Sequence, residues 1–167
     1  MDYAIRRART PDVPAIRALV DANAQSGRLL DKATVALYED IQEFWVAEAA
    51  PGSIIGCGAL HVMWEDLAEI RTVAVSAAHQ GSGVGNQIVV ALLAAARELG
   101  VSRVFVLTFA VEFFRRHGFA EIRGQATTPE VYAELLQSYD EGVAEFLDLD
   151  RVKPNTLGNT RMMLRMR

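Results

Sequence analysis

A loop with three glycines carries the clearest chemical signal in the sequence. It runs from Gln80 to Gly85 as Gln-Gly-Ser-Gly-Val-Gly, between an apolar stretch and a stretch with helical spacing. Its glycines, Gly81, Gly83 and Gly85, allow successive backbone N–H groups to turn towards one point. The opening turn of the next helix adds N–H groups without helical acceptors and the positive end of the helix dipole. Such a loop can bind a phosphate group without a lysine.

Three kinds of phosphate loop look like this one, and spacing separates them. The P-loop ends in Gly-Lys-Ser/Thr, whereas this loop continues as Gly-Asn-Gln at 85–87. A dinucleotide fingerprint counted from Gly81 and Gly83 needs a small residue at position 86 and an acid about twenty positions later. Position 86 is Asn, and the later position falls in the apolar run 104–107, which has no acid. This pattern therefore does not fit either. What fits is Gln/Arg-x-x-Gly-x-Gly/Ala after an apolar strand, and with this pattern the chain resembles the GNAT family of acetyl-CoA-dependent N-acetyltransferases. A glycine-rich turn without a ligand is the alternative.

The composition is that of an ordinary globular protein. The chain has 167 residues, 51% of them hydrophobic and 23% charged, and we expect residues 1–167 to form a single domain. A net charge of −4 without runs of like charge argues against a nucleic acid or an anionic membrane as partner. Cys57 is the only cysteine, the start lacks a signal-peptide pattern, and the longest apolar run, 88–96, is too short to span a bilayer. We therefore expect a cytoplasmic protein.

The elements around the loop are predicted from hydrophobic spacing. Alternation predicts a first strand at 3–9, and Thr10 as N-cap with Pro11 at the first helical position predicts the helix that follows. The further elements, in chain order, are a helix over 32–42, strands at 44–47, 54–64 and 67–76, the loop with a helix to residue 99, a strand at 103–108, a helix over 111–117, a strand at 118–122, a helix over 129–140 capped by Thr128, and a strand at 162–166. A helical crossover joins the strands on either side of the loop helix, so these two should be parallel and the sheet mixed.

This order of elements resembles that of the GNAT family over nearly the whole chain. The resemblance implies an α/β protein with a mixed, twisted sheet of six to seven strands and helices on both faces. Segment 113–119, Phe-Phe-Arg-Arg-His-Gly-Phe, is similar to the family's aromatic turn after the fifth strand. Segments 69–75, 105–108 and 153–162 resemble the short stand-alone branch of amino-acid N-acetyltransferases, the N-acetylglutamate synthases. Long members carry an arginine-sensing kinase-like domain, for which a chain of this length has no room.

The resemblance also implies where acetyl-CoA binds. Its pyrophosphate would contact the glycine loop, and its pantetheine arm would pair with the preceding strand, on the side of the strand through Leu107. The residues assigned to the cofactor are Val73, Ala74, Val75, Gln80, Gly81, Ser82, Gly83, Val84, Gly85, Phe113 and Phe114. No metal is expected, because His61, His79 and His117 lack zinc-ligand spacing and are interpreted as structural. Cys57 is interpreted as a buried side chain rather than a nucleophile.

The implied reaction is direct attack of a neutral amine on the thioester carbonyl in a ternary complex. Glu69 is the candidate base, acting through water, and the N–H of Val73 is the candidate oxyanion donor. In a regular strand both would face the same way as Arg71, with which Glu69 could instead form a structural ion pair. The family's usual acid for the thiolate is a tyrosine at the position of Phe114. Thiolate is a tolerable leaving group even without this acid, and acid help could come from water or another phenol. Tyr139 is the candidate phenol, although a helical tyrosine is more often part of a core.

The candidate substrate-binding residues carry cationic or amide groups: Arg71, Lys32, Asn155, Asn159 and Arg161. Each could instead be a solvated or turn-forming side chain. The predicted reaction is acetylation of the α-amine of glutamate or glutamine, the first step towards arginine. The alternatives are a GNAT enzyme acting on a polyamine, an aminoglycoside or a protein N-terminus, and an acetyl-CoA-binding regulatory module without turnover. The family often forms dimers, so the resemblance allows a homodimer, but no stretch of the sequence identifies an interface.

Overall fold

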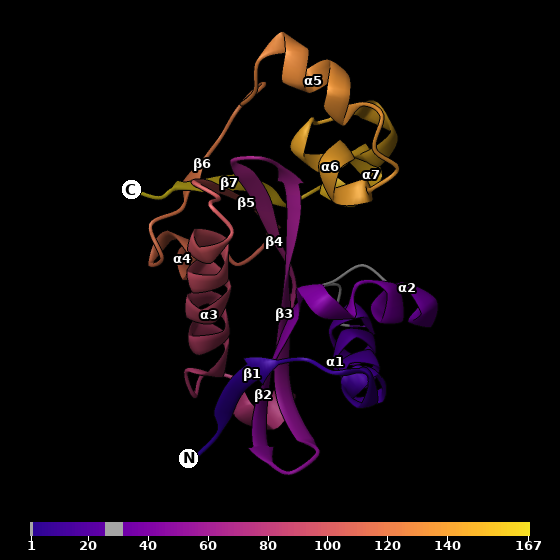
Figure 1. The fold of residues 1–167 in the computed structure, drawn as a ribbon, viewed down its shortest axis with the longest axis vertical. Helices are drawn as coiled ribbons and strands as arrows, with labels where there is room; N and C mark the ends of the chain where they lie inside the picture. Colours follow the sequence, from indigo (N-terminus) through magenta and orange to yellow (C-terminus); the bar gives the residue numbers. More distant parts are fainter. Residues whose placement is uncertain (1, 26–31) are drawn as a thin grey trace. The chain divides into compact units, whose positions relative to one another are not determined.

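The computed structural model describes residues 2–25 and 32–167 (Figure 1). The predicted loop between the first two helices lies mostly outside these residues. Seven strands form a sheet in the order β1-β2-β3-β4-β5-β7-β6. The strands are β1 Ala4–Arg7, β2 Phe44–Ala50, β3 Ser53–Trp64, β4 Leu67–Val75, β5 Arg103–Thr108, β6 Ala120–Glu121 and β7 Thr160–Arg165. The helices are α1 Val13–Gln25, α2 Thr34–Glu39, α3 Val84–Glu98, α4 Val111–Arg115, α5 Pro129–Leu135, α6 Glu141–Phe146 and α7 Lys153–Thr156, with short 3-10 helices η1 Thr10–Asp12, η2 Ile41–Glu43, η3 Ala77–His79 and η4 Asp150–Val152.

The predicted mixed sheet is confirmed by the strand pairing. Strand β4 runs parallel to β5, pairing Leu67–Glu69 with Arg103–Phe105. Strand β7 is antiparallel to β5 from Arg103↔Arg165 to Thr108↔Thr160, so it begins two residues before the predicted position. A parallel pair inside an otherwise antiparallel arrangement needs a crossover, and α3 provides it.

The described chain divides into two compact units, and the first spans Met1–His61 and Ile70–Leu99. Here α1 and α2 lie on one side of β1 to β3 and α3 lies on the other (Figure 1). Residues of β3 alternate accordingly. Cys57 and Ala59 belong to the apolar core shared with α1 and α2, whereas Gly56 and Gly58 face α3. Both faces of β3 are therefore covered, which explains its nearly continuous apolar sequence.

The start of α1 differs from the prediction. Thr10 is not the N-cap, because residues 10–12 form the 3-10 helix η1 and α1 begins after it. The carboxylate of Asp12 accepts a hydrogen bond from the N–H of Arg9 at 2.7 Å. The guanidinium of Arg6 donates to both Asp12 oxygens, at 2.8 and 2.9 Å, and to Glu48 at 2.8 Å. A buried acid held by β1 therefore orients the first helix.

We expect acid to weaken this anchor. Hydrogen bonding to Arg6 lowers the pKa of Asp12 below its usual value, so the stabilisation is complete above the unfolded pKa and is lost as pH falls through the folded one. Asp12→Asn should therefore cost about 1.5–3 kcal/mol at pH 7, and less as the pH approaches 2. Urea unfolding at both pH values measures the difference. Asp2→Asn, which changes an exposed acid next to β1, is the control, and an equal cost at both pH values would contradict the assignment.

The second unit comprises Val62–Glu69 and Gly100–Arg167. Its core includes Phe105 and Phe146, whose rings meet edge to face at 5.4 Å. Thr128 caps α5 as predicted, accepting from the N–H of Val131 at 3.3 Å. The helix predicted over 129–140 is too long, however. It ends at Leu135, and Asp140 caps a new helix, α6, by accepting from the N–H of Val143 at 3.1 Å.

Within the described part of the chain, no three His, Cys, Asp or Glu side chains are placed to hold a metal ion together. None of the helices found there has the length and apolar character needed to cross a membrane.

Candidate active site

The glycine loop joins β4 to α3 within the first unit. After β4 the chain forms the 3-10 helix η3, and α3 begins at Val84. Gly81 has a φ of +76° and Gly83 a φ of +89°, in the left-handed region that other residues rarely adopt. A Cβ at either position would have no heavy atom within 4 Å. Backbone conformation, not lack of space, therefore requires glycine here.

Polar side chains hold this loop. Gln80 donates from Nε2 to the carbonyl of Val75 at 3.4 Å, which ties the loop to the end of β4. The Nδ1 of His79 lies 2.7 Å from the Oγ of Ser76, and the N–H of Ser82 donates to the His79 carbonyl at 3.3 Å. His79 thus has the structural role that its spacing suggests.

The N-terminus of α3 is suited to an anion. Gly83 is its N-cap and offers no side chain to the free N–H groups. The N–H of Gln87 donates to the Gly83 carbonyl at 3.1 Å, so the N–H groups of residues 84–86 precede the first helical bond. Gly85, predicted to turn an N–H within the loop, is instead the second residue of α3. The first turn, Val-Gly-Asn-Gln, is uncharged, and with the helix dipole it can bind a phosphate group.

Two glycines of β3 allow α3 to pack directly on the strand. A Cβ on Gly56 would lie 2.9 Å from the Cδ1 of Ile88, and a Cβ on Gly58 would lie 2.7 Å from the Cγ2 of Ile88 and 3.1 Å from Leu92. The close approach positions α3, and with it the glycine loop. Cys57 between them points to the other face, where its Sγ lies 3.6 Å from the Thr72 carbonyl. Burial raises the pKa of this thiol to about 12, in agreement with the interpretation that it is no nucleophile.

Strand β4 is distorted at Thr72, which has a φ of +57°. This conformation is rare for a β-branched residue and breaks the alternation of a regular strand. Glu69 is buried, with 4% exposure, and so is Ile70, whereas Arg71 and Val73 are partly exposed. The shared face of Glu69, Arg71 and Val73 was expected only for a regular strand, and the positive φ of Thr72 interrupts that regularity between Arg71 and Val73.

The aromatic turn closes helix α4. The N–H of Phe119 donates to the Phe114 carbonyl at 3.2 Å, and the N–H of Gly118 to the Arg115 carbonyl at 2.9 Å. These are the two bonds of a Schellman motif, with Gly118 left-handed at a φ of +93°. The rings of Phe114 and Phe119 meet at 5.3 Å, as the hydrophobic contact of this motif. The spacing is thus explained by a helix end, and cofactor contact by Phe113 and Phe114 stays a prediction.

Two of the three tail residues predicted to bind substrate line a polar cavity of about 290 Å³ in the second unit, Asn159 and Arg161. The Arg161 guanidinium donates to the carbonyl of Gly124 at 3.2 Å and to that of Phe146. Its Nε is buried, and among the described residues it has no hydrogen-bond partner. Burial lowers the pKa of Arg161. Asn155 lies in α7, where only its backbone is described.

Lys32 and Arg71, the other predicted substrate-binding residues, both influence the pKa of one carboxyl group in the first unit. This group belongs to Asp40, the C-cap of α2. Burial and the neighbouring Glu43 raise the pKa of Asp40, whereas the charges of Lys32, Arg71 and His61 oppose this rise. The sequence did not single out Asp40 or Glu43.

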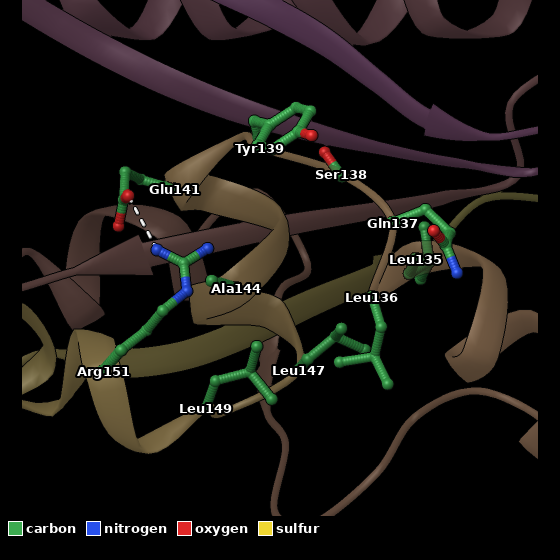
Figure 2. Close-up of a pocket in the computed structure, with 10 residues that line it drawn as sticks. All are labelled: Leu135, Leu136, Gln137, Ser138, Tyr139, Glu141, Ala144, Leu147, Leu149 and Arg151. Carbon is green, nitrogen blue, oxygen red and sulfur yellow. Dashed lines mark hydrogen bonds and ion pairs between the residues drawn. The ribbon is translucent and has the colours of Figure 1, made fainter.

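A larger cavity of about 420 Å³ lies beside α5 and α6 in the second unit (Figure 2). Leucine side chains, among them the buried Leu135, line one part of it, and the ion pair of Glu141 and Arg151 at 2.7 Å lines another. Tyr139 also lines it and is 99% exposed. The helical position predicted for Tyr139 is wrong, because the residue lies between α5 and α6. Its role as an acid stays a prediction.

Comparison with known proteins identifies the family of the chain. Residues 4–119 match the model of the acetyltransferase (GNAT) family, and this stretch includes the glycine loop, the distorted strand β4 and the aromatic turn. The chain therefore belongs to the GNAT family of acetyltransferases, as its motifs predicted.

Individual relatives show that, within the family, the chain is similar to the amino-acid acetyltransferases. The chain is 61% identical to the amino-acid acetyltransferase of Mycobacterium tuberculosis over 163 residues, which are 96% of this chain and 92% of that protein. A crystal structure of a protein from the same organism, in complex with CoA, has a TM-score of 0.94 at 60% identity and covers 98% of this chain and 99% of its own. N-acetylglutamate synthase from Neisseria gonorrhoeae, complexed with coenzyme A and N-acetyl-glutamate, has a TM-score of 0.77 at 25% identity over 100% of this chain but only 36% of its own. The predicted resemblance to this branch is confirmed, and CoA is bound in both related structures.

Proposed function

We propose that the chain transfers the acetyl group of acetyl-CoA to the α-amine of glutamate or glutamine, the first step towards arginine. The glycine loop is the observation that carries the proposal, because Gly81, Gly83 and the uncharged first turn of α3 form a site for the pyrophosphate of the cofactor. The likeness to an amino-acid acetyltransferase at 61% identity supports the substrate class.

The residues of β4 supply the groups that direct acetyl transfer needs. Backbone groups of residues 73–75 would pair with the pantetheine arm. The positive φ of Thr72 interrupts the regular strand directly before Val73, which supports the Val73 N–H as donor to the oxyanion. Glu69, buried three residues earlier, would accept the proton of the amine through a water molecule.

Cations of the first unit would hold the acid groups of the substrate. The positive charges of Lys32 and Arg71 both act to lower the pKa of Asp40, which supports their assignment to a substrate carboxylate, and Arg71 can hold a carboxylate with two parallel hydrogen bonds. Asn155, Asn159 and Arg161 stay candidates for substrate contacts from the tail. For Arg161 the support is its buried Nε, which has no hydrogen-bond partner among the described residues.

The test is thiol release from acetyl-CoA with a panel of amines: glutamate, glutamine, other amino acids, spermidine, an aminoglycoside and a short peptide. We expect rapid turnover with glutamate or glutamine only. Turnover only with a cationic amine would overturn the proposed substrate, but the chain would still be an acetyltransferase. CoA binding without turnover of any amine would instead support a regulatory module.

A further inference from the structure

An exposed tyrosine and a leucine-lined cavity lie side by side in the second unit. Tyr139, between α5 and α6, is 99% exposed, and its ring stands away from the leucine side chains (Figure 2). It nevertheless borders the cavity of about 420 Å³. Leu136, three residues earlier, is 49% exposed and lines the same cavity. The lining residues are 135–139, 141, 144, 147, 149 and 151, and we call the surface that they form the α5–α6 face.

The α5–α6 face has the shape and composition of a protein contact surface. An exposed aromatic ring, a half-exposed leucine and a leucine-lined hollow adjoin one another, and adjoining apolar groups of this kind mark a contact with another molecule. Tyrosine is enriched among the side chains that dominate binding at protein interfaces, where they fill pockets on the partner. A cavity of about 150 Å³ already admits a benzene molecule. The cavity beside Tyr139 therefore has room for the ring of a tyrosine.

The charges of the α5–α6 face favour a second copy of the chain as partner. Among the described residues that line the cavity, Glu141 and Arg151 are the charged ones, and their signs are opposite. A nucleic acid or an anionic membrane would find no net positive charge here. Two copies related by a two-fold axis present the same face to each other, so each Glu141 can meet the Arg151 of the other copy. The face also carries both a projecting ring and a hollow, as a self-complementary contact requires.

The ion pair within one copy is compatible with such a contact. Arg151 donates from Nη1 to the Oε1 of Glu141 at 2.7 Å, and the two side chains are 48% and 57% exposed. A pair this open to water contributes little to stability. The guanidinium also has further N–H groups, with which Arg151 can bind a second carboxylate without releasing the first.

We propose that the α5–α6 face is the contact surface of a homodimer. Tyr139 of each copy enters the leucine-lined cavity of the other, and Glu141 and Arg151 pair between the copies. The inference goes beyond the proposed function, because neither the glycine loop nor β4 takes part in the contact. It gives Tyr139 a role that needs its ring and not its hydroxyl group.

Analytical ultracentrifugation of the full chain measures the dissociation constant of the dimer. Tyr139→Ala should raise this constant about 30-fold or more, as truncation of a dominant interface residue does. Tyr139→Phe keeps the ring and should change it less than about threefold. Tyr38→Ala is the matched control, because Tyr38 is a 46% exposed tyrosine of the first unit and should leave the constant unchanged.

Two charge reversals distinguish a contact between copies from an ion pair within one copy. Glu141→Arg leaves two cations on the face and Arg151→Glu leaves two acids, so each variant alone should dimerise at least about 10-fold more weakly than the wild type. Mixed in equal amounts, the two variants should form heterodimers of about wild-type affinity, because each acid then meets an arginine of the other chain. Recovery on mixing would also show that both variants are folded.

Three results would overturn the inference. They are a wild-type chain that stays monomeric up to about 1 mM, a dimer that Tyr139→Ala leaves unchanged, and charge variants that do not recover on mixing. None of them affects the proposed function, because dimerisation is measured without substrate and thiol release is measured separately.

Discussion

Glu69→Gln should lower kcat by about 10²- to 10⁴-fold, the usual contribution of a general base. The substitution keeps the shape of the side chain but removes the proton acceptor. Glu69 is buried on β4, three residues before the distortion at Thr72. Val73, which follows Thr72, is the proposed oxyanion donor. The KM for acetyl-CoA should stay near the wild-type value, because the glycine loop is untouched. Thiol release at saturating substrate measures the effect.

A second buried glutamate provides the control for this prediction. Glu145 on α6 is also buried and has no proposed part in the reaction, so Glu145→Gln tests what removing a buried charge does to stability. Thermal unfolding should show whether each variant folds, and only Glu69→Gln should lose kcat at full occupancy. A kcat within threefold of wild type in a folded Glu69→Gln protein would place the base elsewhere.

The parts of the fold encoded in local sequence were predictable. Strand β5 has the predicted bounds, Arg103–Thr108, because a dense apolar run there follows a glycine stop. Helices α6 and α7 were missed because each is too short to show a repeat of hydrophobic spacing. Asp140, taken for the end of one helix, is the cap of the next. The side chain that caps a helix start also suits a turn, so sequence alone does not separate them.

In the candidate site, too, the features encoded in local sequence were predictable and those set by tertiary contacts were not. The positions of Gly81 and Gly83 follow from spacing, because a left-handed backbone selects glycine locally. The distortion at Thr72 could not be predicted, since a β-branched residue favours a regular strand. The pair of Glu43 and His61 joins residues 18 positions apart in sequence. The antiparallel pairing of β2 with β3 brings the segment before β2 close to His61 on β3. In the sequence, this charged group is indicated only by the acids at positions 40 and 43.

Gly58→Ala should destabilise the first unit by about 1–3 kcal/mol, the cost of overpacking a close-packed core. The new Cβ would lie 2.7 Å from the Cγ2 of Ile88, an atom close to the helix backbone that cannot move away unless α3 shifts. The midpoint of thermal unfolding should fall by about 2–4 °C for each kcal/mol. The KM for acetyl-CoA should rise as well, because the shift moves the first turn of α3 and the glycine loop with it.

A double-mutant cycle tests whether the contact with α3 is the cause. Ile88→Ala removes the obstructing Cγ2 and by itself should cost about 2–5 kcal/mol, because a buried side chain is truncated. Since the new methyl group of Gly58→Ala would occupy part of the space left by Ile88, the double variant should lose less stability than the sum of the single variants, by about 0.5–3 kcal/mol. The KM for acetyl-CoA should recover in parallel. Strictly additive losses would mean that β3 tolerates a side chain at position 58, and that the close packing of α3 on its glycines does not position the cofactor loop.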